Sequence, residues 1–177
     1  YMFYLISIMQ GLLVFKILMI DDEKSYHSLY KEIITEELNV EISFATNGLE
    51  ALSTLEGTIK FDLLILDLDM PKLDGKSTLH NIRKKPAFKN VPIFILTANS
   101  SDENQTELLN MGANDFISKG CTPEIFIARL KALVLYKEVA DKYNSASNTY
   151  EQLLESILTY LKVNLTKIIE DIEQALN

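Results

Sequence analysis

The fold is decided by the segment LLILDLDMP, residues 63–71, in which an apolar run ends in two aspartates. Its first four residues are apolar without alternation, which is typical of a strand covered on both faces in a parallel sheet. Asp67 ends this strand, and Asp69 lies in the turn that follows. Sites in open parallel sheets lie at the carboxyl ends of the strands. Asp67 is therefore both a strand end and a candidate site residue.

Similar apolar runs recur before and after this segment. Buried strands are predicted at residues 16–20, 41–45, 61–66, 91–96 and 114–118. Segments with helical spacing lie at residues 24–38, 48–55, 76–84, 102–111 and 123–136. Five strands that alternate with five helices over short connections predict a doubly wound α/β fold with a parallel sheet.

The composition is that of a globular protein, and the length suits one domain with an appendage or two very small domains. The chain has 177 residues, of which 47% are hydrophobic and 24% charged. Its net charge of −8 and the absence of a basic cluster argue against direct binding to nucleic acid. Cys121 is the single cysteine, so no intrachain disulfide can form. This fits a reducing compartment, and we expect a cytoplasmic protein.

Residues 1–15 form an uncharged, mostly apolar N-terminal extension. A membrane-spanning helix needs about 20 apolar residues. A signal peptide needs a basic start and a cleavage site with small residues. Neither pattern is present, so we expect a packed segment before the first strand and no membrane contact.

The C-terminal region, residues 138–177, differs in character from residues 16–137. Residues 141–149 are polar and weakly helical, and a seam with alternating steps of four and three follows: Leu154, Leu158, Leu161, Leu165, Ile168, Ile172 and Ala175. This heptad rhythm favours a coiled coil that joins two copies of the chain through residues 150–177. The alternative is an amphipathic helix that folds back on its own domain.

Polar residues end the other strands as well. Asp21 and Asp22 follow the first strand, Thr97 follows the fourth, and Lys119 follows the fifth. Taken singly, each could be a turn former, a helix cap or a surface charge. Because the carboxyl ends of parallel strands share one edge, we expect these groups to converge with Asp67. Three clustered carboxylates need a cation, and Mg²⁺ is the natural choice for oxygen ligands.

Such a set of groups suits phosphoryl transfer. A carboxylate can attack phosphorus and form an acyl phosphate. A metal ion and a lysine can neutralise the phosphoryl oxygens, and a hydroxyl can donate a hydrogen bond to them.

Over residues 16–137 the sequence resembles the bacterial response-regulator receiver family, which is CheY-like. The resemblance rests on the acidic pair, on Asp67, on Thr97-Ala98 and on Lys119, at intervals of 45, 30 and 22 residues. Pro71 and Gly75 match the family's turn, and residues 47–52 and 111–117 also resemble family segments. The resemblance implies the strand order 2-1-3-4-5. It also implies a phosphoacceptor that is not an enzyme on other molecules, with a histidine kinase or histidine phosphotransfer protein as its donor.

The resemblance also implies a role for each acidic residue. Asp67 would be the nucleophile and a metal ligand. Asp22 would bind Mg²⁺ directly, and Asp21 would bind it through water. Asp69 would contribute its backbone carbonyl.

Two residues resemble the family's switch. Thr97 would move to hold the phosphoryl group, and Phe116 would follow as an aromatic switch. A core aromatic at position 116 would look the same in sequence. Kinase specificity would lie on the first helix, near residues 25–32.

The sequence departs from the family pattern at Gly120, where proline usually follows the lysine with a cis peptide bond. A cis bond before another residue costs roughly 2.5–4 kcal/mol, which makes the reach of Lys119 an open question. Asp69 and Asn99 occupy positions that set the lifetime of the phosphorylated form in the family, so we expect an altered lifetime.

Two other interpretations remain open. Asp67-Leu68-Asp69 also resembles the nucleophile motif of haloacid-dehalogenase-type phosphatases, although in those enzymes the acidic pair follows the nucleophile. A degenerate receiver that serves only as a structural dimerisation module is the second alternative. The intact acidic set argues against it, and Gly120 keeps it open.

Overall fold

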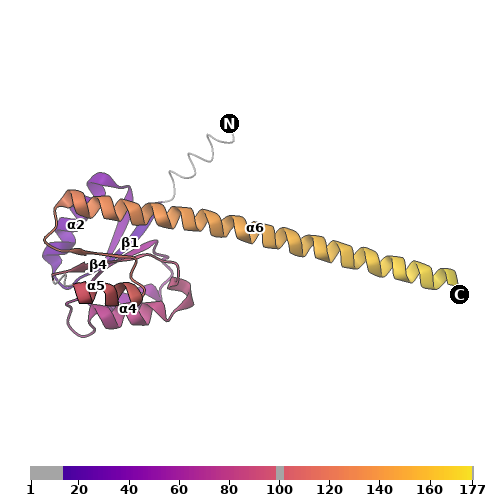
Figure 1. Cartoon of the computed structure of the whole chain (residues 1–177), viewed down its shortest axis with the longest axis horizontal. Helices are drawn as coiled ribbons and strands as arrows, with labels where there is room; N and C mark the ends of the chain where they lie inside the picture. The colour runs from indigo at the N-terminus through magenta and orange to yellow at the C-terminus, as the bar shows by residue number, and fades with distance from the viewer. Residues whose placement is uncertain (1–13, 99–101, 177) are drawn as a thin grey trace. The chain divides into compact units, whose positions relative to one another are not determined.

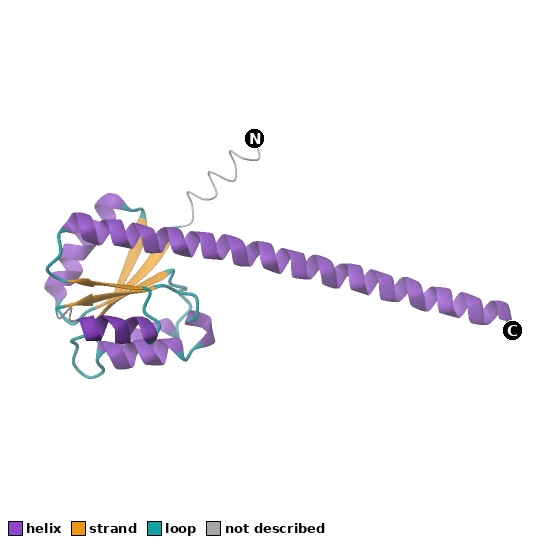
Figure 2. Ribbon diagram, viewed as in Figure 1, coloured by secondary structure: helices purple, strands orange, loops and turns teal. Residues whose placement is uncertain are grey.

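Five apolar runs form the strands of one parallel sheet. The computed structural model describes residues 14–98 and 102–176, with the side chains of 102–104 and 160–176 excepted. The strands are β1 (Phe15–Ile20), β2 (Val40–Ala45), β3 (Leu63–Asp67), β4 (Ile93–Thr97) and β5 (Asp115–Ser118). Their order is β2-β1-β3-β4-β5, so the predicted sheet and the strand order are both confirmed. Figure 2 shows the strands, in orange, between helices.

Helices follow the strands after short turns. They are α2 (Lys24–Glu37), α3 (Gly48–Leu55), α4 (Gly75–Arg83), α5 (Asp102–Asn110) and α6 (Pro123–Leu176), with a short 3₁₀ turn, η1, at Pro86–Phe88. Capping side chains determine where helices α3 and α4 begin. The Asn47 side chain accepts a hydrogen bond from the backbone N–H of Glu50, and the Asp74 side chain accepts one from that of Ser77. Both residues are N-caps, which satisfy donors that a helix leaves free.

The sheet separates two apolar clusters, and alternate residues of each strand face opposite sides. On β1, Leu18 and Ile20 pack with α3, α4 and α5, whereas Ile17 and Met19 pack with α2 and the first turns of α6. All four side chains are buried. Figure 1 shows α2 on one side of the strands and α4 and α5 on the other. Burial on both faces is the reason why the central strands are continuously apolar.

The register aligns the carboxyl ends of four strands. Asp67 on β3 pairs with Leu96 on β4, and Thr97 pairs with Ser118 on β5. Ile20, the last residue of β1, pairs with Leu66. The residues that follow β1 and β5 therefore reach the same edge as the ends of β3 and β4.

Helix α6 continues past the expected end at residue 136 and through the stretch that we expected to be only weakly helical. After Pro123 the chain contains no glycine or proline, so nothing breaks the helix. The chain divides into two compact units, and the boundary between Lys137 and Glu138 falls within α6. Within the described residues, no helix is long and apolar enough to cross a membrane. Most of the N-terminal extension, residues 1–13, and Asn99 lie outside the described residues.

Candidate functional site

Three aspartates meet at the carboxyl edge of the sheet. One carboxylate oxygen from each of Asp21, Asp22 and Asp67 lies within 4.8 Å of the others. Asp21 has no exposed surface and Asp67 only 2%. The structure thus brings together the acidic residues that the sequence predicted to converge.

Lys119 joins this cluster from the turn after β5. Its Nζ atom lies 2.9 Å from Asp21 Oδ2 and 2.9 Å from Asp67 Oδ2, and its side chain is only 8% exposed. The described part of the chain contains no cis peptide bond, so the bond before Gly120 is trans. The backbone N–H of Lys119 still donates to the Thr97 carbonyl at 3.0 Å. Lys119 therefore reaches the acidic cluster without the proline that usually follows it.

The charges of the cluster do not balance. Burial raises the pKa of the Asp67 carboxyl above its ordinary value, against the opposing effect of Lys119. Burial also works to lower the pKa of Lys119, but its contacts with Asp21 and Asp67 outweigh burial and raise it. Two buried carboxylates share one ammonium, so the site favours an additional positive charge.

The donor atoms suit a hard divalent cation. Asp21 Oδ1 accepts a hydrogen bond from the Glu23 N–H at 2.9 Å, and Asp67 Oδ1 accepts one from the Leu68 N–H at 2.8 Å. Among the described residues, Asp21 Oδ2 is buried without a hydrogen bond of ordinary geometry, and the Lys119 ammonium is its charged neighbour. Carboxylate oxygens with unused lone pairs are the ligands that Mg²⁺ prefers. The residues present therefore fit this ion.

Two predicted switch residues lie on neighbouring strands. Thr97 ends β4 and is 2% exposed. Phe116 on β5 is partly buried and packs against the apolar cluster on the side of α3, α4 and α5. Its partner in the sheet is Ile95, two residues before Thr97. Thr97 and Phe116 therefore lie on adjacent strands. Their shared movement remains a prediction, as does the metal-binding role of the Asp69 carbonyl.

Gly75 allows the first turn of α4 to lie against the acceptor. A Cβ atom at this position would overlap the carbonyl oxygen of Asp67 and come within 2.5 Å of Leu68 Cα. The Gly75 N–H donates to the Leu68 carbonyl at 2.9 Å. The sequence marked this glycine only as part of a turn, whereas the structure gives it a steric role beside Asp67.

Tyr26 is a neighbour of the site that the sequence did not indicate. The Lys119 ammonium lies over its ring, 4.2 Å from the ring centroid. Tyr26 lies in the first turn of α2, just after the acidic pair. An aromatic residue in the first turn of a helix is most simply a packing residue, and no spacing pattern links it to a lysine 93 positions later.

Comparison with known proteins places this geometry in a family. The family model for the response regulator receiver domain matches residues 17–131. The chain is 37% identical over 133 residues to the transcriptional regulatory protein CpxR homolog of Haemophilus influenzae, which covers 75% of this chain and 55% of the relative. It is 34% identical over 145 residues to the transcriptional regulatory protein ResD of Bacillus subtilis, with 81% and 58% covered. The chain spans about half the length of the curated relatives that it matches.

Solved structures agree with this result. The receiver domain of the Francisella response regulator 1452 matches with a TM-score of 0.62 and 35% identity, covering 70% of this chain and 98% of that one. The chemotaxis response regulator CheY4 of Vibrio cholerae matches with a TM-score of 0.63 and 27% identity, covering 68% and 99%.

Proposed function

This chain belongs to the response regulator receiver domain family, and on that premise we propose that Asp67 is its phosphoacceptor. The observation that carries the proposal is the cluster of Asp21, Asp22 and Asp67 with the Lys119 ammonium 2.9 Å from two of them. In the reaction, a carboxylate oxygen of Asp67 forms a bond to phosphorus. The bond between phosphorus and the donor's imidazole nitrogen, or the carboxylate oxygen of a small acyl phosphate, breaks. The leaving group takes the electron pair.

Each neighbouring residue has a proposed part in this transfer. Lys119 neutralises a phosphoryl oxygen, and the Thr97 hydroxyl donates a hydrogen bond to another. Asp21, Asp22, Asp67 and the Asp69 carbonyl would hold Mg²⁺. When bound, this ion supplies positive charge to the phosphoryl oxygens and offsets the carboxylates. The domain acts only on its own acyl phosphate, which it forms and later hydrolyses.

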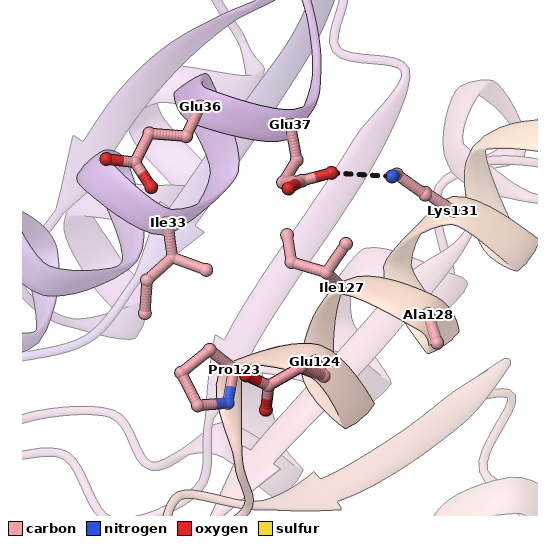
Figure 3. A pocket seen from close by; sticks show the side chains of 8 residues that line it. All are labelled: Ile33, Glu36, Glu37, Pro123, Glu124, Ile127, Ala128 and Lys131. Carbon is pink, nitrogen blue, oxygen red and sulfur yellow. Dashed lines mark hydrogen bonds and ion pairs between the residues drawn. The ribbon is translucent and has the colours of Figure 1, made fainter.

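The phosphodonor is a histidine kinase or a histidine phosphotransfer protein, and we place part of its docking surface in the groove between α2 and α6. The groove has a volume of about 540 Å³ (Figure 3). Ile33 and Ile127 supply apolar surface. Glu36 and Glu124 are acidic, whereas Lys131 is already paired with Glu37 at 2.8 Å. This combination suits a donor helix with apolar residues flanked by lysine or arginine.

The second unit, from Glu138, is proposed to pair with a second copy of itself. Leu154 and Leu158, which begin the heptad seam, are 60% and 57% exposed. Long helices gain most of their stability from packing. Within this unit, the described side chains bury almost no apolar surface. Phosphorylation would then bias the pairing between two arrangements.

Incubation with Mg²⁺ and acetyl phosphate, followed by intact mass measurement, tests the proposed acceptor. We expect the mass of one phosphoryl group to be added, and we expect the gain to require Mg²⁺ and to vanish in Asp67→Asn. The absence of any gain, under conditions that label a known receiver, would favour the structural dimerisation module. The short distance from Lys119 to Asp67 supports the phosphoacceptor over that alternative.

A further inference from the structure

Side-chain contacts hold the Lys119 ammonium in place. Gly120, the next residue, lies in an open part of the turn, where a Cβ atom would meet nothing closer than Ser118 Oγ at 3.7 Å. Among the described residues, the ammonium contacts the carboxylates of Asp21 and Asp67 and the ring of Tyr26. Backbone hydrogen bonds hold the turn, but the ammonium stands at the end of a flexible four-carbon side chain, and its position depends on the side chains that it contacts.

Two of these neighbours are shared with the cation site. A divalent ion among the carboxylates competes with the ammonium for the same oxygens and repels it. The face of the Tyr26 ring attracts an ammonium through its quadrupole, and a hard ion that prefers oxygen ligands does not compete for it. Tyr26 is thus the contact that Lys119 can retain when the carboxylates bind a metal.

The Tyr26 ring is held by a row of aromatic side chains. It stacks on Tyr30 with ring centroids 6.0 Å apart and an interplanar angle of 25°. Tyr30 in turn lies 4.7 Å from Phe126, which lies 5.6 Å from Phe94. Tyr30, Phe126 and Phe94 are all buried. The row connects the Tyr26 ring to the core between the sheet, α2 and the start of α6, and so fixes the surface that faces Lys119.

We propose that Tyr26 is the positioning residue for Lys119, keeping the ammonium beside Asp67 during phosphoryl transfer. This inference rests on the proposed phosphoacceptor function. A cation–π contact contributes a modest amount, so loss of the ring should slow transfer about 2- to 30-fold without abolishing it. The effect should be largest when Mg²⁺ saturates the site, because the carboxylates then hold the ammonium least.

The test compares five variants of the full chain, four single and one double, by their initial rates of phosphorylation with acetyl phosphate and saturating Mg²⁺. Tyr26→Leu removes the ring and should be slow, whereas Tyr26→Phe keeps the ring face and should restore most of the rate. Tyr30→Leu removes the ring on which Tyr26 stacks but leaves the Tyr26 ring itself, so it should slow labelling less than Tyr26→Leu does once the rates are corrected for folded protein. Lys119→Gln provides the background for a double substitution. In that background Tyr26→Leu should have no further effect, because its contribution acts through the ammonium.

Several outcomes would overturn the inference. Two of them concern Tyr26 itself: a wild-type phosphorylation rate in Tyr26→Leu, or a rate in Tyr26→Phe as low as that of Tyr26→Leu. The other two are a loss of rate in Tyr30→Leu as large as that in Tyr26→Leu, and the same slowing by Tyr26→Leu in the Lys119→Gln background. Thermal unfolding of each variant checks folding, and Tyr26→Met replaces the leucine variant if that one unfolds. A wild-type protein that takes no label would overturn the proposed function itself, which distinguishes the two failures.

Discussion

Both units of this chain expose helices to solvent, but they differ in what stabilises them. In the first unit, Ile17, Leu64 and Ile95 have no exposed surface, and their strands pair within one sheet. In the second unit, Tyr143 and Tyr150 are 74% and 69% exposed. The first unit is thus held by contacts between residues far apart in sequence, whereas the described side chains of the second unit, from residue 138 to 159, are almost all exposed. An isolated helix has little stability in water, which is the reason for our proposal that the second unit pairs with a second copy.

The largest expected effect comes from removing a core side chain of the first unit, which tests whether buried packing distinguishes the two units. Phe94→Ala deletes a fully buried ring that packs on Phe126 and should lower the free energy of unfolding by about 3–5 kcal/mol. Urea denaturation followed by circular dichroism measures the change. The matched control is Tyr143→Ala in the second unit, whose effect should stay within about 0.5 kcal/mol. Comparable losses in the two variants would contradict the distinction.

A smaller steric change tests how tightly the site is built into the first unit. Gly75→Ala places a methyl group against the Asp67 carbonyl and should cost about 1–3 kcal/mol of stability. Because the clash displaces the end of β3, phosphorylation should also slow. Gly57→Ala is the control, since its nearest contact is the Thr54 carbonyl at 3.2 Å, far from the site. The free energy of unfolding and the rate of phosphorylation are measured on the same samples. If Gly75→Ala changes neither, the backbone accommodates the methyl group without strain, and the proposed steric role of Gly75 is wrong.

The second unit is tested by its oligomeric state. Leu154→Asp with Leu158→Asp puts charges on the heptad seam and should convert a dimer to a monomer in sedimentation equilibrium. The first unit should keep its unfolding midpoint within the error of the measurement. Leu153→Asp with Ser156→Asp, which lie off this seam, is the control. If deletion of residues 150–177 left the oligomeric state unchanged, with and without a phosphoryl mimic, the case for pairing would be removed.

The smallest expected effect concerns the charge of the site. Burial raises the folded-state pKa of Asp67 above its ordinary value of 3.8, so its ionised form costs stability. This cost is absent below the unfolded-state pKa and reaches its full size above the folded-state pKa. Asp67→Asn should therefore be more stable than the wild type at neutral pH, and Mg²⁺ should narrow the difference. Thermal unfolding in the presence of Mg²⁺ or of a chelator measures the difference in stability. If Asp67→Asn is less stable than the wild type, burial of the Asp67 carboxylate is not the dominant effect.

Much of the first unit follows from local pattern. The run Leu63 to Leu66 lacks alternation because helices cover both faces of β3, and the structure confirms that reading. The polar strand ends also converge as the shared edge required. The contact between Tyr26 and Lys119 did not follow, because a cation–π pair has no periodicity and joins distant residues. The full length of α6 was underestimated because its polar stretch has weak propensity, yet it contains no residue that stops a helix.

The row of aromatic rings beside the site also has an optical consequence. The chain has no tryptophan, so its near-ultraviolet fluorescence comes mainly from its 8 tyrosines. The Lys119 ammonium lies 4.2 Å from the centroid of the Tyr26 ring, which stacks on Tyr30, and a cation among the carboxylates would repel this ammonium. Emission from this pair should therefore change as the site fills, while the exposed tyrosines of the second unit supply a constant background. Such a change would allow cation binding at the acidic cluster to be followed without a label.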